Sequence, residues 1–247
     1  MKRVPEIAVY SCVVGRYDRE LMPVEPTDGI AYVCFTDAPA SLEAEGWELR
    51  PLRHPPHVTG GHAINRWHKI FAHRLFPGTR WSVYLDGNLR FAGSFSALVD
   101  TVEREQAGLG AFRHPDGHDL EEEIAACRKL KFTRRDLARI DDQIEAYRQS
   151  GLPFDRVIPT NSLLVRDHTS SLVASAMDLW WDHICRFTRR DQVSLPFVIR
   201  ETGLPFAWLD GEDSANAALL SRVWHSPPLG KRIERRLRSS FGYIPRG

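Results

Sequence analysis

The sequence has few cysteines and no long apolar run. Its four cysteines, Cys12, Cys34, Cys127 and Cys185, include no Cys-x-x-Cys pair, and the first two lie in apolar, strand-like segments, where a thiol packs as a small hydrophobic group. No run reaches the ~18 apolar residues that cross a bilayer, and the amino terminus has no signal-peptide core. We therefore expect a soluble protein in a reducing compartment, the cytoplasm.

The chain also lacks a charge excess, an internal repeat and a Ser/Gly-rich linker. Its 247 residues carry 33 Lys plus Arg against 32 Asp plus Glu, a formal net charge of +1. This balance argues against a nucleic-acid-binding surface and favours a small or neutral partner. The length suffices for one full hydrophobic core. We predict a single domain over residues 1–247 with a basic C-terminal segment, 231–247.

Two catalytic motifs are absent as well. No Gly-rich loop with Lys or Arg follows the first apolar strand, which argues against a nucleotidyltransferase, although that alternative stays open. No Gly-x-Ser-x-Gly sequence is present, so a hydrolase with a nucleophile elbow is disfavoured.

Strand-like and helix-like patterns alternate along the chain. Strands are predicted at 7–14, 30–35, 47–52, 81–85, 109–113, 157–165 and 206–209. Helices are predicted at 64–76, 94–106, 119–131, 134–149, 170–187 and 190–201. This alternation is typical of an α/β protein with a mainly parallel sheet flanked by helices. We expect the highly charged segment 114–150 to form an outer layer or an insertion.

The segment Trp81–Leu85 leads directly into Asp86-Gly87-Asn88. Ligands of such sheets bind at the carboxyl ends of the strands, so this turn marks the predicted edge of an active site. Asp86 and Asn88 are two residues apart and, in an extended turn, present oxygen ligands of the kind that Mg²⁺ or Mn²⁺ prefers. Asp-Gly-Asn is also ordinary turn chemistry, and this alternative stays open.

A second set of polar residues lies near the C-terminus. His225 could complete a metal site with Asp86, and Lys231, after the flexible Gly230, could neutralise a diphosphate. The alternative is a solvated basic helix, because Lys and Arg recur between 231 and 238. With its interspersed Ile and Leu, this segment could also rest on an anionic membrane surface.

Three polar positions adjoin other predicted elements. Asp37 follows the second strand and could accept a hydrogen bond from a base or ribose, or could cap a turn. Asn161 lies at a strand edge, and Asp191 begins a helix, where a carboxylate is favourable in any case. On the helix at 64–76, Arg66 and Lys69 share a face that we expect to meet ligand or water.

Taken in order, these segments resemble a GT-A glycosyltransferase. The closest resemblance is to a family first catalogued as a domain of unknown function, which includes plant hexosyltransferase candidates of mucilage synthesis. Four segments carry it: Ala8-Val9-Tyr10 with Gly15-Arg16-Tyr17-Asp18, Cys34-Phe35-Thr36-Asp37 with Gly46-Trp47, Arg66-Trp67-His68-Lys69-Ile70, and Tyr84-Leu85-Asp86-Gly87-Asn88. His114-Pro115, Trp180-Trp181 and Arg190-Asp191-Gln192 add to it. Roughly residues 7 to 200 take part. That family is similar in turn to the retaining transferases of glycosyltransferase family eight.

The resemblance implies a GT-A fold and roles for particular residues. Asp86 and Asn88 would correspond to an Asp-x-Asp metal motif, with His225 as the further ligand of Mn²⁺ or Mg²⁺ and Lys231 on the diphosphate. Asn161, Asp191 and Gln192 would be the catalytic residues around the sugar. The remaining nucleotide-sugar contacts would be Tyr10, Arg16, Asp37, Arg66 and Lys69.

The implied activity is transfer of a hexosyl group from a nucleotide diphosphate sugar, uridine-linked, to a glycan, lipid-linked or protein acceptor. Retention of configuration is expected by resemblance alone. One departure is Asn88, which stands where the motif has a second carboxylate, so weaker metal binding is expected. A nucleotide-sugar-binding protein with little or no catalysis is therefore the second hypothesis.

Overall fold

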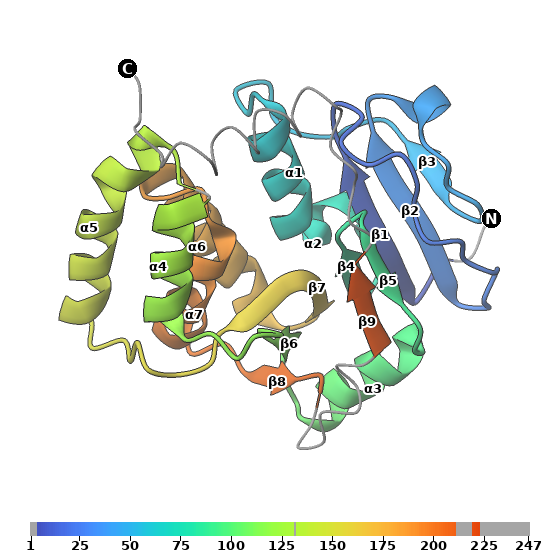
Figure 1. Cartoon of the computed structure of the whole chain (residues 1–247). Coiled ribbons are helices and arrows are strands. Elements are labelled where there is room, and N and C mark those ends of the chain that lie inside the picture. The colour runs from blue at the N-terminus through green and yellow to red at the C-terminus, as the bar shows by residue number, and fades with distance from the viewer. Residues whose placement is uncertain (1–3, 131, 211–218, 223–247) are drawn as a thin grey trace.

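The protein is described from a computed structural model that covers residues 4–130, 132–210 and 219–222 (Figure 1). A seven-stranded sheet runs through the centre in the order β3-β2-β1-β4-β7-β6-β8. The predicted His225, Lys231 and basic segment 231–247 lie outside the described residues. None of the described helices has the length and apolar character needed to cross a membrane.

Four neighbouring strands are parallel, which fits the predicted α/β architecture. They are β1 (Ile7–Val13), β2 (Ile30–Thr36), β3 (Glu48–Arg50) and β4 (Trp81–Leu85). β1 and β4 are buried along their whole length, and this explains their nearly continuous apolar sequences. The carboxyl ends of β1 and β4 therefore meet at one edge of the sheet.

The sheet is not wholly parallel, because β7 (Pro159–Asp167) runs antiparallel to both of its neighbours, β4 and β6 (Leu109–Arg113). β8 (Phe206–Trp208) then pairs parallel to β6 at the edge. The predicted strand at 157–165 thus exists but lies two residues later. Its antiparallel direction brings the start of β7 beside the end of β4, where Ser162 accepts a hydrogen bond from the Asp86 amide at 2.8 Å.

Helices cover both faces of the sheet. On one face, α1 (Gly61–Ile70), α2 (Ala72–Leu75), α6 (Ser171–Arg186) and α7 (Asp191–Thr202) build a core with β1, β2 and β7. On the other face, α3 (Phe95–Arg104) packs on alternate residues of the same strands. The two cores place the sheet in the middle of a three-layer arrangement.

The helix predicted at 64–76 is broken into α1 and α2. The break occurs at Phe71, whose backbone angles of φ −94° and ψ 42° are not helical. The buried ring of Phe71 packs in the core there, so tertiary packing outweighs the uninterrupted helical pattern of the sequence. α1 also begins three residues earlier than predicted, after Gly60.

The charged segment forms an outer pair of helices, as predicted. α4 (Leu120–Leu130) and α5 (Arg134–Gln149) share a separate small core with α7, which includes Ile124, Ile140 and Val193. Thr133 and Asp136 close the start of α5 with a reciprocal capping box. Figure 1 shows these helices gathered with α6 and α7 at the end of the sheet away from β3.

Three short elements were not predicted. One is a single 3₁₀ turn, η1 (Pro39–Ser41), after β2. The other two, β5 (Leu89–Phe91) and β9 (Leu220–Arg222), form a two-stranded antiparallel sheet. Because β5 directly follows the Asp-Gly-Asn turn, this pairing brings Arg222 to the same edge of the central sheet.

Candidate active site

A cavity of about 380 Å³ lies where β1 and β4 end. Its volume falls within the range of small-molecule sites. It is lined by residues from the ends of β1 and β4, the loop after β1, the first turns of α1, and β9: Cys12, Val13, Val14, Tyr17, Asp18, Gly61, His62, Asn65, Arg66, Asp86, Gly87, Asn88 and Arg222. Of the predicted site residues, Arg66, Asp86 and Asn88 belong to this lining.

Asp86 stands at the tip of β4, at the edge of this cavity. Its Oδ1 accepts a hydrogen bond from the Tyr84 hydroxyl at 2.9 Å and lies 3.5 Å from the Lys69 Nζ. The side chain nevertheless remains 32% exposed. Asp86 is therefore held in position by two neighbours and is still open to a ligand.

Gly87 allows a second carboxylate to approach this turn. A Cβ at position 87 would lie 2.4 Å from Oδ2 of Asp18, so any side chain there would force Asp18 to move. The buried Asp18 lines the same cavity as Asp86 and Asn88. Asp18 is a site residue that the sequence analysis did not single out, although it belongs to a segment that carries the resemblance.

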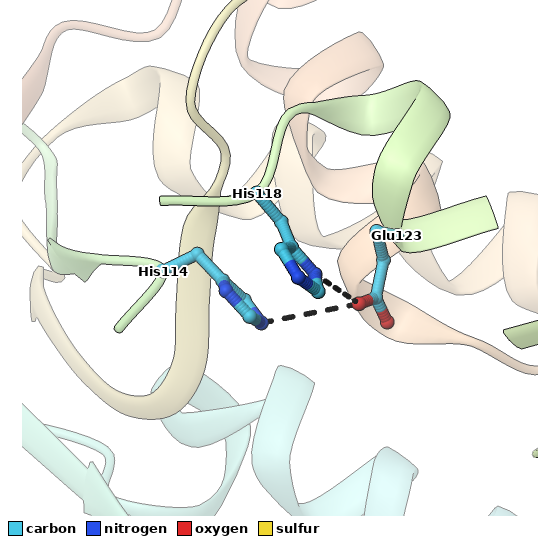
Figure 2. A group of neighbouring side chains, drawn as sticks. All are labelled: His114, His118 and Glu123. Atoms are coloured by element: carbon cyan, nitrogen blue, oxygen red, sulfur yellow. Dashed lines mark ion pairs between the residues drawn. The ribbon is translucent and has the colours of Figure 1, made fainter. Parts of the chain in front are cut away.

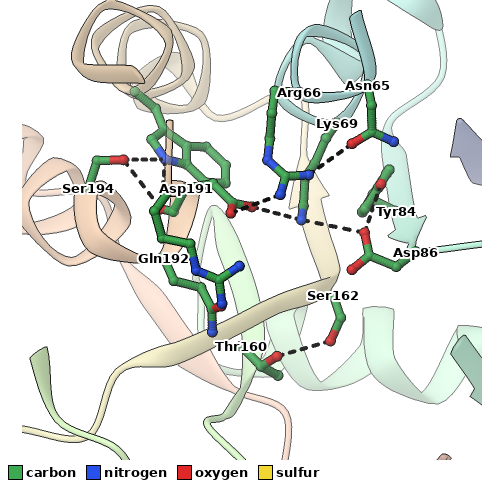
Figure 3. A network of polar contacts seen from close by, with 12 residues as sticks. Asn65, Arg66, Lys69, Tyr84, Asp86, Thr160, Ser162, Asp191, Gln192 and Ser194 are labelled. Atoms are coloured by element: carbon green, nitrogen blue, oxygen red, sulfur yellow. Dashed lines mark hydrogen bonds and ion pairs between the residues drawn. The ribbon is translucent and has the colours of Figure 1, made fainter. Parts of the chain in front are cut away.

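A buried charge network joins α1, β4 and α7 (Figure 3). Lys69 Nζ lies 2.8 Å from Oδ2 of Asp191 and 3.5 Å from Oδ1 of Asp86, so one ammonium group connects both carboxylates. Arg66 contributes a further contact of 3.3 Å to Oδ1 of Asp191. The expectation that Lys69 faces ligand or water is corrected, because its side chain is only 2% exposed.

The network shifts the pKa values of its buried members. Burial tends to raise the pKa of Asp191, but the charges of Arg66 and Lys69 outweigh it and hold this pKa far below the usual range. Burial lowers the pKa of Lys69, and the two carboxylates only partly offset that effect. The lowered pKa keeps Asp191 ionised near neutral pH.

Asp191 and Gln192 begin α7, and both are buried. Arg190 occupies the N-cap position and donates to Oε1 of Gln192 through Nη2 and to Oε1 of Glu123 through Nε, the latter at 2.7 Å. The N-terminal end of a helix favours a negative charge, and Asp191 supplies one. The side chain of Trp180 fixes the same turn by donating to the Asp191 carbonyl at 3.2 Å.

Asn161 lies in β7 and is 2% exposed. Its Nδ2 and Oδ1 are both buried without a hydrogen-bond partner among the described residues. A buried amide without partners costs about 1–3 kcal/mol, so an unpaired group of this kind calls for an explanation. A ligand that hydrogen-bonds to the amide would supply one.

Three of the predicted nucleotide-sugar contacts, Tyr10, Arg16 and Asp37, do not line the cavity. Tyr10 is fully buried, and its hydroxyl donates to the carbonyl oxygens of His68 and Lys69 at the end of α1. Its predicted contact with a nucleotide is therefore corrected to a structural role. Arg16 is exposed with a φ of 59°, and Asp37 accepts from the Gly15 amide at 2.9 Å. Arg16 and Asp37 shape the loop after β1.

A second cavity, of about 360 Å³, adjoins the first and shares His62 with it. Its lining includes Arg135 and Arg139 of α5, Trp181 of α6, and Arg189, which lies between α6 and α7. Burial and then the charge of Arg66 lower the pKa of His62 to about 4. A neutral imidazole therefore separates the two cavities near pH 7.

Comparison with known proteins places most of the chain in one family. Residues 53–207 match the family described as TOD1/MUCI70, glycosyltransferase-like domain. This segment contains Arg66, Lys69, Asp86, Asn88, Asn161, Asp191 and Gln192.

Two proteins of Arabidopsis thaliana are similar in sequence. The probable hexosyltransferase MUCI70 is 28% identical over 163 residues, which are 62% of this chain and 27% of that protein. The alkaline ceramidase TOD1 is 27% identical over 142 residues, 53% of this chain and 30% of that protein. The chain thus spans less than a third of either relative.

The crystal structure of mouse xyloside xylosyltransferase 1 in its apo form aligns with 83% of this chain and 84% of its own, at 9% identity and a TM-score of 0.47. The family assignment rests on the match over residues 53–207. The protein belongs to the TOD1/MUCI70 glycosyltransferase-like domain family.

Proposed function

We propose that this protein transfers a hexosyl group from a nucleoside diphosphate sugar, uridine-linked, to an acceptor. One observation carries the proposal: Lys69 joins Asp191 on α7 to Asp86 beside the cavity. This contact couples a buried, ionised carboxylate to the strand tip where the resemblance places the donor. Membership of a glycosyltransferase-like family supports the same reaction class.

The residues around the Asp-Gly-Asn turn fit a hard divalent cation. Asp18, Asp86 and Asn88 line one cavity and offer carboxylate and amide oxygens, the ligands that Mg²⁺ and Mn²⁺ prefer. We propose that they hold such an ion. When bound, the ion supplies positive charge that stabilises a leaving diphosphate.

The chain's own residues have distinct roles in this proposal. Arg66, which lines the cavity and is 15% exposed, binds the negatively charged part of the donor. Asp191 stabilises the positive charge that develops at the anomeric carbon, because its lowered pKa keeps it ionised near neutral pH. Asn161 and Gln192 orient sugar hydroxyls through their amides. The stereochemical outcome, retention, is proposed from the resemblance alone.

The second cavity is the proposed acceptor site. It meets the donor cavity at His62 and contains Trp181, a half-buried aromatic side chain. Aromatic rings provide apolar surface against which a sugar ring can pack. A glycan in this cavity would approach the donor from the α1 side.

Calorimetry with uridine diphosphate, with and without Mn²⁺, tests the donor site. We expect binding that requires the metal and is lost in Asp86→Ala, but kept in Asp178→Ala, whose side chain is 55% exposed in a surface ion pair. A bound donor at 100 times its dissociation constant should raise the melting temperature by roughly 5–10 °C.

A donor-hydrolysis assay with a panel of uridine diphosphate sugars then tests turnover. Release of uridine diphosphate from one sugar supports the proposal. Binding without turnover of any donor would favour the nucleotide-sugar-binding protein, and absence of binding would contradict both hypotheses. Release of sphingosine from ceramide without donor binding would instead point to the activity in the name of the ceramidase relative.

A further inference from the structure

Three side chains outside the two cavities converge on one point. His114 and His118 lie in the loop between β6 and α4, and Glu123 lies in the first turn of α4 (Figure 2). The His114 Nε2 is 3.9 Å and the His118 Nδ1 is 3.7 Å from Oε2 of Glu123. Figure 2 shows both imidazole rings directed at this carboxylate.

The distances suit a small tetrahedral cation. Bonds of about 2.0–2.2 Å place neighbouring tetrahedral ligand atoms roughly 3.3 Å apart. The three potential ligand atoms lie within 4.8 Å of one another, and the two contacts to Glu123 exceed the ideal edge by about half an ångström. The two imidazole rings are stacked with their centroids 4.4 Å apart. Small rotations of these rings would bring the three ligand atoms to tetrahedral spacing.

Glu123 is organised as a ligand by contacts on its other oxygen. Its side chain is 1% exposed, and its Oε1 accepts from the Arg190 Nε at 2.7 Å and from the Cys127 thiol at 3.1 Å. These contacts fix the carboxylate with Oε2 turned toward the histidines. Metal-binding carboxylates are commonly held by hydrogen bonds of this type.

The two imidazoles also have the chemistry of ligands. The Nδ1 of His118 is buried and makes no hydrogen bond among the described residues. The Nδ1 of His114 accepts a hydrogen bond from the Asp116 amide at 3.3 Å, and it lies 4.0 Å from the Asp116 carboxylate. A cation on Nε2 of His114 would put the ring proton on Nδ1, so the ring would have to give up the Asp116 amide and turn toward the Asp116 carboxylate, which could then accept that proton.

We propose that His114, His118 and Glu123 form a zinc site, distinct from the oxygen-rich site at Asp86. Two imidazoles and one carboxylate favour Zn²⁺ over Mg²⁺ or Mn²⁺. Three protein ligands leave a fourth position for water. The site fastens the 114–119 loop to α4 and, through Glu123 and Arg190, to the first turn of α7.

The test uses the 247-residue chain without a histidine tag, stripped with a chelator and then dialysed against Zn²⁺. About one Zn²⁺ per chain should remain bound. Replacement by Co²⁺ should give the intense visible absorption of a tetrahedral N/O site. His118→Asn should lower zinc affinity at least tenfold.

Two controls separate this site from others. His57→Asn removes an exposed histidine and should keep full zinc binding. Asp86→Ala should also keep the zinc, so a failed donor site and a failed zinc site give different results. Unchanged zinc binding in His118→Asn would overturn the proposal, as would wild-type protein without bound zinc or cobalt colour. If His118→Asn does not fold, the zinc content and cobalt absorption of the wild-type protein still test the proposal.

Discussion

The Nζ of Lys69 lies 2.8 Å from Oδ2 of Asp191, although 122 positions separate the two residues. Both side chains are 2% exposed. Loss of one partner from such a pair leaves an uncompensated charge inside the protein. This contact therefore links the stability of the fold to the site.

Removal of the ammonium group should destabilise the protein strongly. We expect Lys69→Met to lower the free energy of unfolding by about 3–5 kcal/mol, because Asp191 loses its closest counter-charge. Arg74→Ala, which breaks an exposed ion pair with Asp178, should cost at most about 1 kcal/mol. Urea unfolding measures both, and equal effects would contradict a buried electrostatic role for Lys69.

The pKa of Asp191 predicts a pH dependence of stability. Its folded pKa lies below the unfolded value, about 3.9 for an aspartate. The stabilisation is therefore fully present well above pH 4 and declines as the pH falls below it. Between about pH 5 and pH 2, the free energy of unfolding of Asp191→Asn should fall less steeply with decreasing pH than that of the wild-type protein. Parallel curves for the two proteins would refute this assignment.

Replacement of Asn88 tests the metal site at the strand tip. Asn88→Asp adds a second negative charge to the turn and should tighten Mn²⁺ binding roughly tenfold, because ligand charge tunes affinity for hard cations. Asn88→Ala removes an oxygen donor and should weaken it. Titration followed by the paramagnetic resonance of Mn²⁺ measures both, and a change in the same direction for the two variants would exclude Asn88 as a ligand.

Gly87 offers a steric test of the same turn. In Gly87→Ala the new methyl group would meet Asp18 Oδ2 at 2.4 Å, so we expect a loss of about 1–3 kcal/mol in stability and weaker donor binding. Gly61→Ala is the matched control for stability. Its methyl group would lie at an ordinary 3.4 Å from Val14 in the first turn of α1. Calorimetry of both variants gives stability and affinity, and an unaffected Gly87→Ala would mean that Asp18 is not held there.

Trp181 tests the acceptor cavity separately from the donor. Trp181→Ala should raise the KM for a sugar acceptor roughly three- to tenfold, as expected for the loss of one aromatic contact. Donor hydrolysis in the absence of acceptor should stay near the wild-type rate. An equal loss of transfer to the acceptor and of donor hydrolysis would mean that Trp181 supports the fold and does not bind the acceptor.

The sequence predicts the elements well where burial on one or both faces imposes a regular pattern. β1, β4, α5 and α7 lie within one residue of their predicted bounds. The break at Phe71 was missed because the helical apolar pattern continues through it, and only packing interrupts the helix. The pairing of β5 with β9 was missed because each strand is only three residues long and is identified as a strand only by its hydrogen bonding to the other.

The residues of the candidate site also fall into two groups, those that local sequence signals predict and those that only the structure reveals. A strand tip with Asp86-Gly87-Asn88 can be found in the sequence, because apolar runs and turn residues are local signals. Asp18 and the cluster of His114, His118 and Glu123 lack such a signal, since their spacing matches no common ligand motif and only folding brings their side chains together.

The sequence alone therefore determined the α/β pattern and the polar turn after β4, because both follow from local burial and backbone preference. Tertiary structure decided that β7 runs antiparallel, that Lys69 is buried between two carboxylates, and that Tyr10 supports α1. These relationships depend on contacts between residues far apart in the chain. Packing and electrostatic contacts between elements decide them, and no local sequence pattern predicts such contacts.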